Sequence, residues 1–282
     1  MRTRHPIVSF VYYVVVIGLA MMLMNPICLG ISFAGAFASS IALKGKYFIK
    51  YNLMYMIPVF ILTAVINPLF SHEGMTILMY LPTGNPLTLE SIYYGLASAT
   101  MLVTIMCWFV SVNETMTTDK IICLFGKIVP TMSLVLSMSL RFVPRFISHI
   151  KQVNESRKCM GLMAEGNVLL RMKNAAEVLS ITVTWALEDA VDTADSMKSR
   201  GYGLAKRTAY SKYRFNRNDE IMLGIVVVAT VYILCGIISG KIYWQYYPNV
   251  CGNISGWYAI SVYIVYGILC LGVIADRIIQ KV

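Results

Sequence analysis

The sequence predicts an all-α integral membrane protein with six transmembrane helices and a central cytoplasmic region of amphipathic helices. Of its 282 residues, 57% are hydrophobic and 13% are charged, whereas soluble domains average about 25% charged residues. The mean hydropathy is +0.65. The formal net charge is +10, but the lysines and arginines gather on one side of a consistent topology, as in membrane proteins. Binding of nucleic acid is therefore the weaker interpretation, and we expect none.

Two apolar runs at the start of the chain predict a helical hairpin. The first run covers residues 6–24 and the second covers residues 27–43, with the turn dipeptide Asn25-Pro26 between them. Each run is near the roughly 20 residues that a helix needs to cross a bilayer. Basic residues flank both open ends of the hairpin and none stands at its turn, which places the N-terminus in the cytoplasm.

Four further apolar runs complete the six predicted spans. These runs cover residues 53–70, 92–112, 221–238 and 257–274. The loop 71–90 contains no lysine or arginine, and Lys241 is the one basic residue in the loop 240–256. Both loops are therefore predicted to be external, and both termini are predicted to be cytoplasmic.

The segment 113–219 holds 16 of the 24 lysines and arginines. Within it, residues 131–143 are apolar but bracketed by Pro130 and Pro144. Thirteen helical residues reach only about 20 Å, against a hydrocarbon core of roughly 30 Å, so this helix should lie at the interface or pack on the spans. In residues 167–200, apolar spacings of three and four predict one amphipathic helix or two in series.

The chain accordingly divides into three predicted regions. Residues 1–112 form an N-terminal membrane region of four spans, residues 113–219 form the cytoplasmic helical region, and residues 220–282 form a C-terminal membrane region of two spans. The glycines at 201 and 203 should end the last amphipathic helix, since glycine commonly follows a basic final turn.

No catalytic or cofactor motif is present in the sequence. It contains neither a G-x-x-x-x-G-K-[ST] loop, nor H-E-x-x-H, nor a nucleophile elbow. The seven cysteines include no C-x-x-C pair, and the adjacent His72 and Glu73 are more typical of a solvated loop than of a metal site. We therefore expect no enzyme, no cofactor and no metal. The spans are nearly free of ionisable residues, which argues against a proton relay.

The stretch from Glu188 to Arg207 is the strongest candidate for function. It is too charged to cross a bilayer, and it carries four acidic residues between positions 188 and 195 before Arg200-Gly201. A helix lying on anionic lipid would explain the basic charge but not the acidic residues. An arginine beside a glycine at a helix end suits docking into a groove of a partner. The residues alone favour lipid and partner about equally.

Short motifs follow one another along nearly the whole chain. They are His5-Pro6, Asn25-Pro26, Asn67-Pro68-Leu69-Phe70 with His72 and Gly74, Thr88-Leu89-Glu90-Ser91, Leu140-Arg141-Phe142-Val143-Pro144, and Ser199-Arg200-Gly201-Tyr202-Gly203 with Lys206-Arg207-Thr208. In this order they resemble the transmembrane T component of energy-coupling factor (ECF) transporters, the EcfT/CbiQ family. These are vitamin and transition-metal importers related to ABC transporters.

The resemblance implies both a location and partners. The chain would be a multi-pass protein of the prokaryotic plasma membrane, in contact with membrane lipid. Its partners would be two ABC-type ATPase subunits and a substrate-binding S component. ATP hydrolysis would take place in the partners, and the choice of substrate would lie in the S component.

The resemblance also implies where the ATPases dock. In this family two short Ala-Arg-Gly-type motifs end cytoplasmic coupling helices, which insert into grooves of the ATPases. The second motif matches here as Ser199-Arg200-Gly201, and the first falls at Cys159-Met160-Gly161, where methionine replaces the arginine. Arg157 or Lys158 would supply the missing charge, or Met160 would pack into an apolar part of the groove. Gly161 also fits a plain helix C-terminus.

These expectations lead to two hypotheses. In the first, the chain is the scaffold and energy-coupling subunit of an ECF-type importer and transmits ATP-driven motion of the ATPases to the S component. Packing by Trp185, Leu187 and Ala190 would make its coupling helices rigid. The alternative is a self-contained six-span channel or carrier whose basic cytoplasmic segment binds lipid. A membrane enzyme is a third and weaker alternative.

Overall fold

The computed structural model describes residues 4–71, 73–80, 86–162, 168–204, 213, 215–252 and 256–279. His72 and Lys206-Arg207-Thr208 of the motifs above lie outside the described residues. The chain forms two compact units, one of residues 1–121 with 213–282 and one of residues 122–212. We refer to them as the bundle unit and the α6/α7 unit. The predicted division into membrane and cytoplasmic regions stays a prediction.

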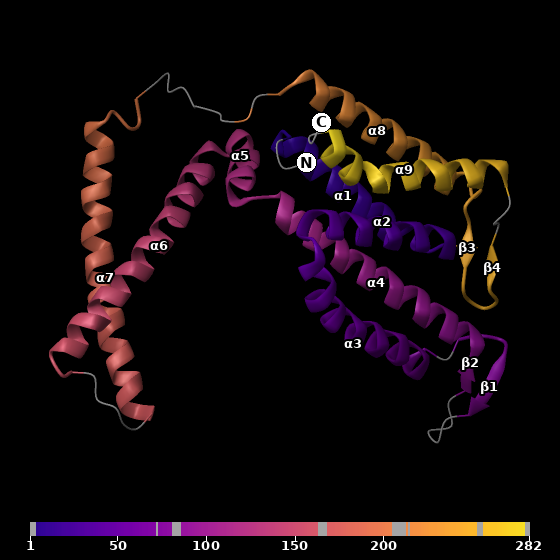
Figure 1. Ribbon diagram of the computed structural model, residues 1–282, viewed down its shortest axis with the longest axis horizontal. Helices are drawn as coiled ribbons and strands as arrows, with labels where there is room; N and C mark the ends of the chain where they lie inside the picture. Colours follow the sequence, from indigo (N-terminus) through magenta and orange to yellow (C-terminus); the bar gives the residue numbers. More distant parts are fainter. Residues whose placement is uncertain are drawn as a thin grey trace. The chain divides into compact units, whose positions relative to one another are not determined.

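Six long helices make up the described part of the bundle unit (Figure 1). They are α1 (Pro6–Met22), α2 (Pro26–Lys44), α3 (Lys46–Phe70), α4 (Leu89–Thr115), α8 (Arg217–Ile238) and α9 (Trp257–Ile279). Between α3 and α4 lies a short antiparallel pair of strands, β1 (Ile77–Tyr80) and β2 (Pro86–Thr88). A second pair, β3 (Trp244–Gln245) and β4 (Cys251–Gly252), lies between α8 and α9. A shorter helix, α5 (Thr118–Ile128), follows α4.

Four of the described helices are long and apolar enough to cross a membrane. They are Pro26–Lys44, Leu89–Thr115, Arg217–Ile238 and Trp257–Arg277, while Pro6–Met22 and Met54–Phe70 are shorter apolar helices. The predicted all-α architecture is therefore confirmed, and four of its helices are candidate membrane spans. The count of six spans stays a prediction that depends on the two shorter helices.

The first two helices begin where the sequence supplies caps. The Asn25 side chain accepts a hydrogen bond from the Ile27 backbone N–H at 3.1 Å, and Pro26 follows as the first helical residue. A proline loses nothing there, because its missing N–H would have no helical partner in any case. His5 and Pro6 begin α1 in the same way. The predicted Asn25-Pro26 turn is thus also the N-cap of α2.

The core of the bundle unit lies among α1, α2, α4, α8 and α9. Its largest side chains, Tyr12, Trp108 and Tyr266, are almost completely buried. Small residues let the helices approach closely: a Cβ on Gly35 would lie 2.7 Å from the Cβ of Cys270. The Ser40 hydroxyl donates to the Cys107 carbonyl at 2.9 Å across the α2–α4 contact. Such small and polar contacts are typical of helices that pack within a membrane.

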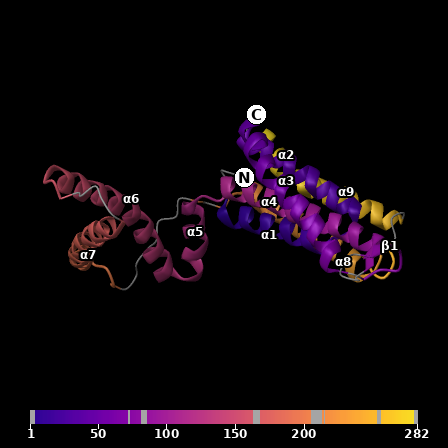
Figure 2. The same cartoon turned by 90° about the horizontal axis from the view of Figure 1, so that it is seen from below.

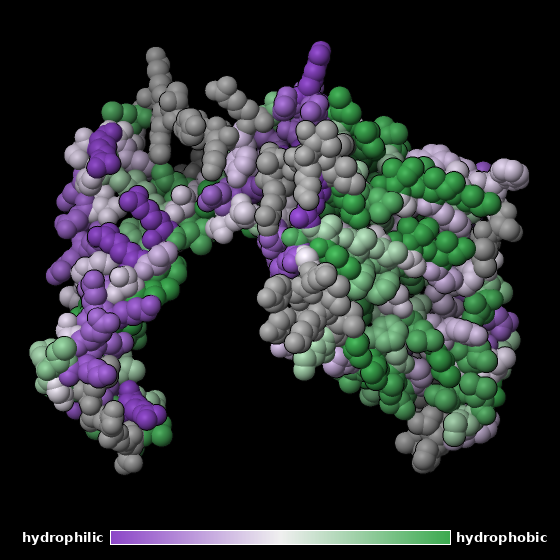
Figure 3. All heavy atoms as spheres, viewed as in Figure 1, coloured by the Kyte–Doolittle hydropathy of each residue, from purple (hydrophilic) through white to green (hydrophobic). Residues whose placement is uncertain are grey.

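Both hairpins lie at one end of this bundle, and the start of α8 lies at the opposite end (Figures 1 and 2). The Tyr246 hydroxyl, next to β3, donates to the Met24 carbonyl at the α1–α2 turn at 2.7 Å. The predicted external loops and the Asn25-Pro26 turn therefore share one end of the bundle. On its visible face, apolar side chains cover most of the bundle surface (Figure 3), as contact with lipid requires.

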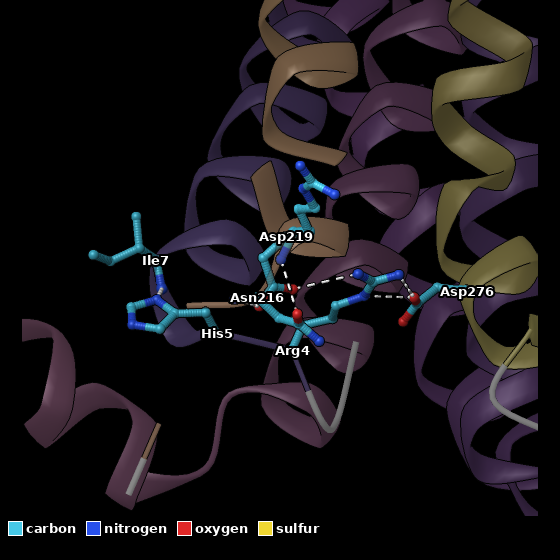
Figure 4. A network of polar contacts seen from close by, with 7 residues as sticks. Arg4, His5, Ile7, Asn216, Asp219 and Asp276 are labelled. Atoms are coloured by element: carbon cyan, nitrogen blue, oxygen red, sulfur yellow. Dashed lines mark hydrogen bonds and ion pairs between the residues drawn. The ribbon is translucent and has the colours of Figure 1, made fainter. Parts of the chain in front are cut away.

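At the opposite end, Arg4 joins the ends of two helices (Figure 4). Its guanidinium lies 3.3 Å from an Asp219 carboxylate oxygen and 2.7 Å from an Asp276 oxygen. Both carboxylates are buried. Asp219 also accepts from the Asn216 backbone N–H, which completes a capping box at the start of α8. One arginine thus holds the N-terminus to the start of α8 and the end of α9.

Candidate functional site

The α6/α7 unit contains all the residues that the sequence predicted for docking. Its two long helices are α6 (Pro130–Cys159) and α7 (Val168–Ser199). Within the predicted region 167–200, residues 168–199 thus form one helix rather than two. The apolar segment 131–143 is not a separate short helix, because α6 continues through Pro144. Pro144 is exposed, so water can reach the carbonyl whose helical hydrogen bond the proline removes.

Contacts along α6 and α7 show that the two helices are antiparallel. Arg145 pairs with Asp189 at 2.9 Å, and Arg157 pairs with Glu177 at 2.5 Å. Between them, the His149 ring stacks on Trp185 with centroids 4.0 Å apart. As residue numbers rise along α6, those of the contacted residues fall along α7. The end of α6 therefore lies beside the start of α7, far from the end of α7.

The end of α6 is a Schellman turn. The Gly161 N–H donates to the Lys158 carbonyl at 3.1 Å, and the Leu162 N–H donates to the Arg157 carbonyl at 3.0 Å. Gly161 has φ +70°, a conformation that glycine adopts with little strain. Met160 is the C-cap residue and its side chain is 64% exposed.

The end of α7 repeats this turn. The Gly201 N–H donates to the Lys198 carbonyl at 2.9 Å, and the Tyr202 N–H donates to the Met197 carbonyl at 3.0 Å. Gly201 has φ +81°. Arg200 therefore corresponds to Met160, and Ser199 to Cys159, and all four residues are exposed. The sequence predicted the two helix ends, but their identical hydrogen bonding is visible only in the structure.

Arg157 points to the neighbouring helix rather than to the surface. Only 7% of it is exposed, and its guanidinium bonds both Glu177 and Asn174 of α7. The hydrogen bond from Arg157 lowers the pKa of Glu177 below its ordinary value. Lys158, by contrast, is exposed. Of the two predicted substitutes for the missing arginine, Lys158 is thus the one on the surface.

The acidic residues of α7 are only partly available to a partner. Asp189 forms the ion pair with Arg145, whose guanidinium also lies 5.4 Å from the centre of the Trp185 ring. Glu188, Asp192 and Asp195 are exposed. Part of the acidic face that suggested a partner thus binds α6 instead.

Two of the three residues expected to pack the helices together face outward. Trp185 packs against His149 and Phe146, as predicted. Leu187 is 65% exposed and Ala190 is exposed. The buried side of α7 instead carries Val178 and Thr182. The apolar spacing was correct as a helix signal but did not identify the face that contacts α6.

Comparison with curated proteins gives several matches to energy-coupling factor transporter transmembrane proteins. The sequence is 25% identical over 251 residues to the energy-coupling factor transporter transmembrane protein EcfT of Lactococcus lactis subsp. cremoris, a match that covers 83% of this chain and 91% of the relative. EcfT of Lactobacillus helveticus is 31% identical over 107 residues, which are 37% of this chain and 39% of the relative. EcfT of Staphylococcus aureus is 26% identical over 119 residues, 42% and 44% of the two chains.

No protein-family model matches the sequence. The similarity to the Lactococcus protein nevertheless extends through both units, as the order of the short motifs predicted. Over most of its length the chain is thus similar to EcfT, the transmembrane protein of energy-coupling factor transporters.

Proposed function

We propose that this chain is the scaffold and energy-coupling subunit of an ECF-type importer. In this role it transmits ATP-driven motion from two ABC-type ATPase subunits to a substrate-binding S component. The chain itself hydrolyses nothing. It crosses the plasma membrane six times with both termini in the cytoplasm, and the α6/α7 unit lies on the cytoplasmic side. The name of its relatives supports the transporter assignment.

The observation that carries this proposal is the repeated helix end. Two helices of one unit end in the same turn, and each presents an exposed C-cap side chain next to a glycine. A glycine lets another backbone approach closely. At one end Ser199, Arg200 and Gly201 dock into one ATPase, where Arg200 binds carboxylates or free carbonyls at a helix end. At the other end Cys159, Met160 and Gly161 dock into the second ATPase, with Met160 in an apolar part of the groove.

The antiparallel pairing of α6 and α7 determines how motion is transmitted. Asn174 contacts Arg157 near the end of α6, and Arg200 lies 26 residues further along α7. At 1.5 Å per residue the two docking ends are about 40 Å apart. The ion pairs of Arg145 and Arg157 and the stacked His149 and Trp185 hold the helices together between those ends. Closure of the ATPases then moves the pair as a rigid body.

Affinity capture tests this proposal. The tagged chain is co-expressed with candidate P-loop ATPases and an S component, purified in detergent, and assayed after reconstitution for ATP-dependent uptake. Arg200→Glu should reduce ATPase capture by tenfold or more, because it places a carboxylate where the partner presents acceptors. Lys198→Glu is the matched control, since it reverses an exposed charge on the same turn without changing the C-cap.

Each outcome decides between defined alternatives. Equal capture by wild type and Arg200→Glu would show that Arg200 does not dock. Transport by the chain alone in liposomes, without any ATPase, would support the self-contained carrier instead. Genes for two ATPases and a small hydrophobic protein next to the gene for this chain would support the importer.

A further inference from the structure

A groove of about 830 Å³ lies between α6 and α7, near the end of α6 and the start of α7. Arg157, Lys158 and Arg171 line it, together with the amide side chains of Asn154 and Asn174. None of its lining residues is aspartate or glutamate. The groove therefore offers several hydrogen-bond donors and an excess of positive charge.

Arg157 leaves one donor in this groove without a partner. Its terminal nitrogen bonds Glu177 and Asn174, but its Nε–H, which is buried, has no hydrogen-bond partner among the described residues. Leaving a buried donor unpaired is costly, and such groups are normally satisfied by protein, water or ligand. Arg157 also lines the groove, so a small shift of its side chain would let this N–H donate to an acceptor bound there.

The charges around the groove favour an anion. Glu177 balances Arg157, which leaves Lys158 and Arg171 as two exposed cations on the lining. A phosphate group offers several acceptor oxygens and a charge that matches this pair. The lining also includes the apolar residues Ile150, Val178 and Leu179, which suit the glycerol and acyl portion of a lipid.

We propose that the groove between α6 and α7 binds a phosphate group, as the headgroup of an anionic phospholipid or as free phosphate. Arg157 Nε, Lys158 and Arg171 bind the phosphate oxygens. This binding site adjoins the docking end of α6 and shares Lys158 with it, but it adds Arg171 and the buried Arg157 and does not use the C-cap residue Met160. The ligand would join the end of α6 to the start of α7.

Calorimetry on the full-length chain in dodecyl maltoside tests the proposal and separates the two sources. The probes are dihexanoyl phosphatidylglycerol, dihexanoyl phosphatidylcholine as the zwitterionic comparison, and inorganic phosphate, all in chloride buffer. Saturable binding of the phosphatidylglycerol in preference to the phosphatidylcholine assigns the groove to anionic lipid. Saturable binding of inorganic phosphate alone assigns it to a soluble anion. The proposal is overturned if neither the phosphatidylglycerol nor inorganic phosphate binds saturably.

Variants show whether the binding occurs in the groove. Arg171→Gln should weaken binding of the preferred probe by about tenfold, because it removes a charged hydrogen bond. Lys173→Gln is the matched control: it removes an exposed charge from the same helix at a residue that does not line the groove. An equal loss in both variants would mean diffuse charge attraction and would overturn the site. Arg157→Lys keeps the charge but removes Nε, and it should also weaken binding.

Discussion

Met160 and Arg200 occupy the same position in two copies of one helix-ending turn. Each is the C-cap residue and is followed by a glycine with positive φ. Three residues before the C-cap, the two residue types are reversed: α6 has Arg157 there and α7 has Met197. Arg157 turns inward to Glu177, so the end of α6 presents a thioether where the end of α7 presents a guanidinium. The two ends are equal in backbone but different in surface chemistry.

Met160→Arg tests whether the two ends are interchangeable. The C-cap is exposed, so the longer side chain can be accommodated without disturbing the turn. ATPase capture should be equal to wild type or stronger, since the variant supplies the arginine that the family motif carries. Met160→Glu should reduce capture, because it places a carboxylate in the proposed apolar contact. Capture that is unchanged by both variants would exclude this end from docking.

Gly201→Ala and Gly161→Ala test the helix-ending turns. At φ +81° and +70° an alanine costs about 1 kcal/mol or more in local strain. At Gly201 the added Cβ would also meet Leu204 Cδ1 at 3.0 Å, whereas it meets nothing within 4 Å at Gly161. Gly201→Ala should therefore lower the melting temperature more. The control is Gly224→Ala within α8, which also meets nothing within 4 Å and should cause no loss.

The Arg157–Glu177 pair predicts a dependence on pH. Its hydrogen bond lowers the pKa of Glu177 in the folded chain, so the carboxylate stabilises the fold at any pH above its ordinary pKa. This contribution is lost as the pH falls through the lowered pKa. Glu177→Gln should lower the melting temperature at pH 7, and the difference from wild type should shrink below about pH 4.5. Glu188→Gln, at an exposed position of the same helix, should show neither effect.

Arg4→Gln should destabilise the bundle unit by about 3 kcal/mol, because it leaves the buried carboxylates of Asp219 and Asp276 without their arginine. Chemical unfolding in detergent measures the change. Arg217→Gln is a matched control at an exposed position of α8 and should change stability by less than about 0.5 kcal/mol. Adding Asp276→Asn to Arg4→Gln should recover part of the loss. An Arg4 variant as stable as the control would show that the network contributes nothing.

Gly95→Ala should separate α3 from α4. A Cβ at Gly95 would lie 2.9 Å from the backbone carbonyl oxygen of Ala64 and 3.1 Å from Pro68 Cδ, neither of which can rotate away. The expected cost is about 1–3 kcal/mol. Gly30→Ala in α2 meets nothing within 4 Å and is the control. Equal melting temperatures for the two variants would contradict the close helix approach seen here.

The sequence predicted those features that depend on neighbours along the chain. Apolar runs of sufficient length predicted the helices of the bundle, and Asn25-Pro26 predicted the turn between the first two. Gly161 and Gly201 marked the helix ends correctly, because a left-handed residue after a final turn depends on local backbone sterics. The resemblance to EcfT likewise came from short motifs read in order.

The sequence could not predict which residues meet across the fold. Arg4 was interpreted only as a topology signal, although it binds Asp219 and Asp276, which lie more than 200 residues away. The sequence did contain one sign of this contact, since Asp219 and Asp276 are acidic residues at the ends of two apolar spans. Leu187 and Ala190 were expected to pack the coupling helices but are exposed in the structure, because a 3.6-residue spacing identifies a helix but not its partner.

For this chain, the sequence by itself determined the membrane class, the helices of the bundle, the two glycine-terminated ends and the family resemblance, since each follows from local hydrophobicity and backbone preference. Only the tertiary structure decided that α6 continues through Pro144, that α6 and α7 are antiparallel, and that Arg157 faces inward. These depend on the register between two helices, and register is set by side chains that meet in space rather than along the chain.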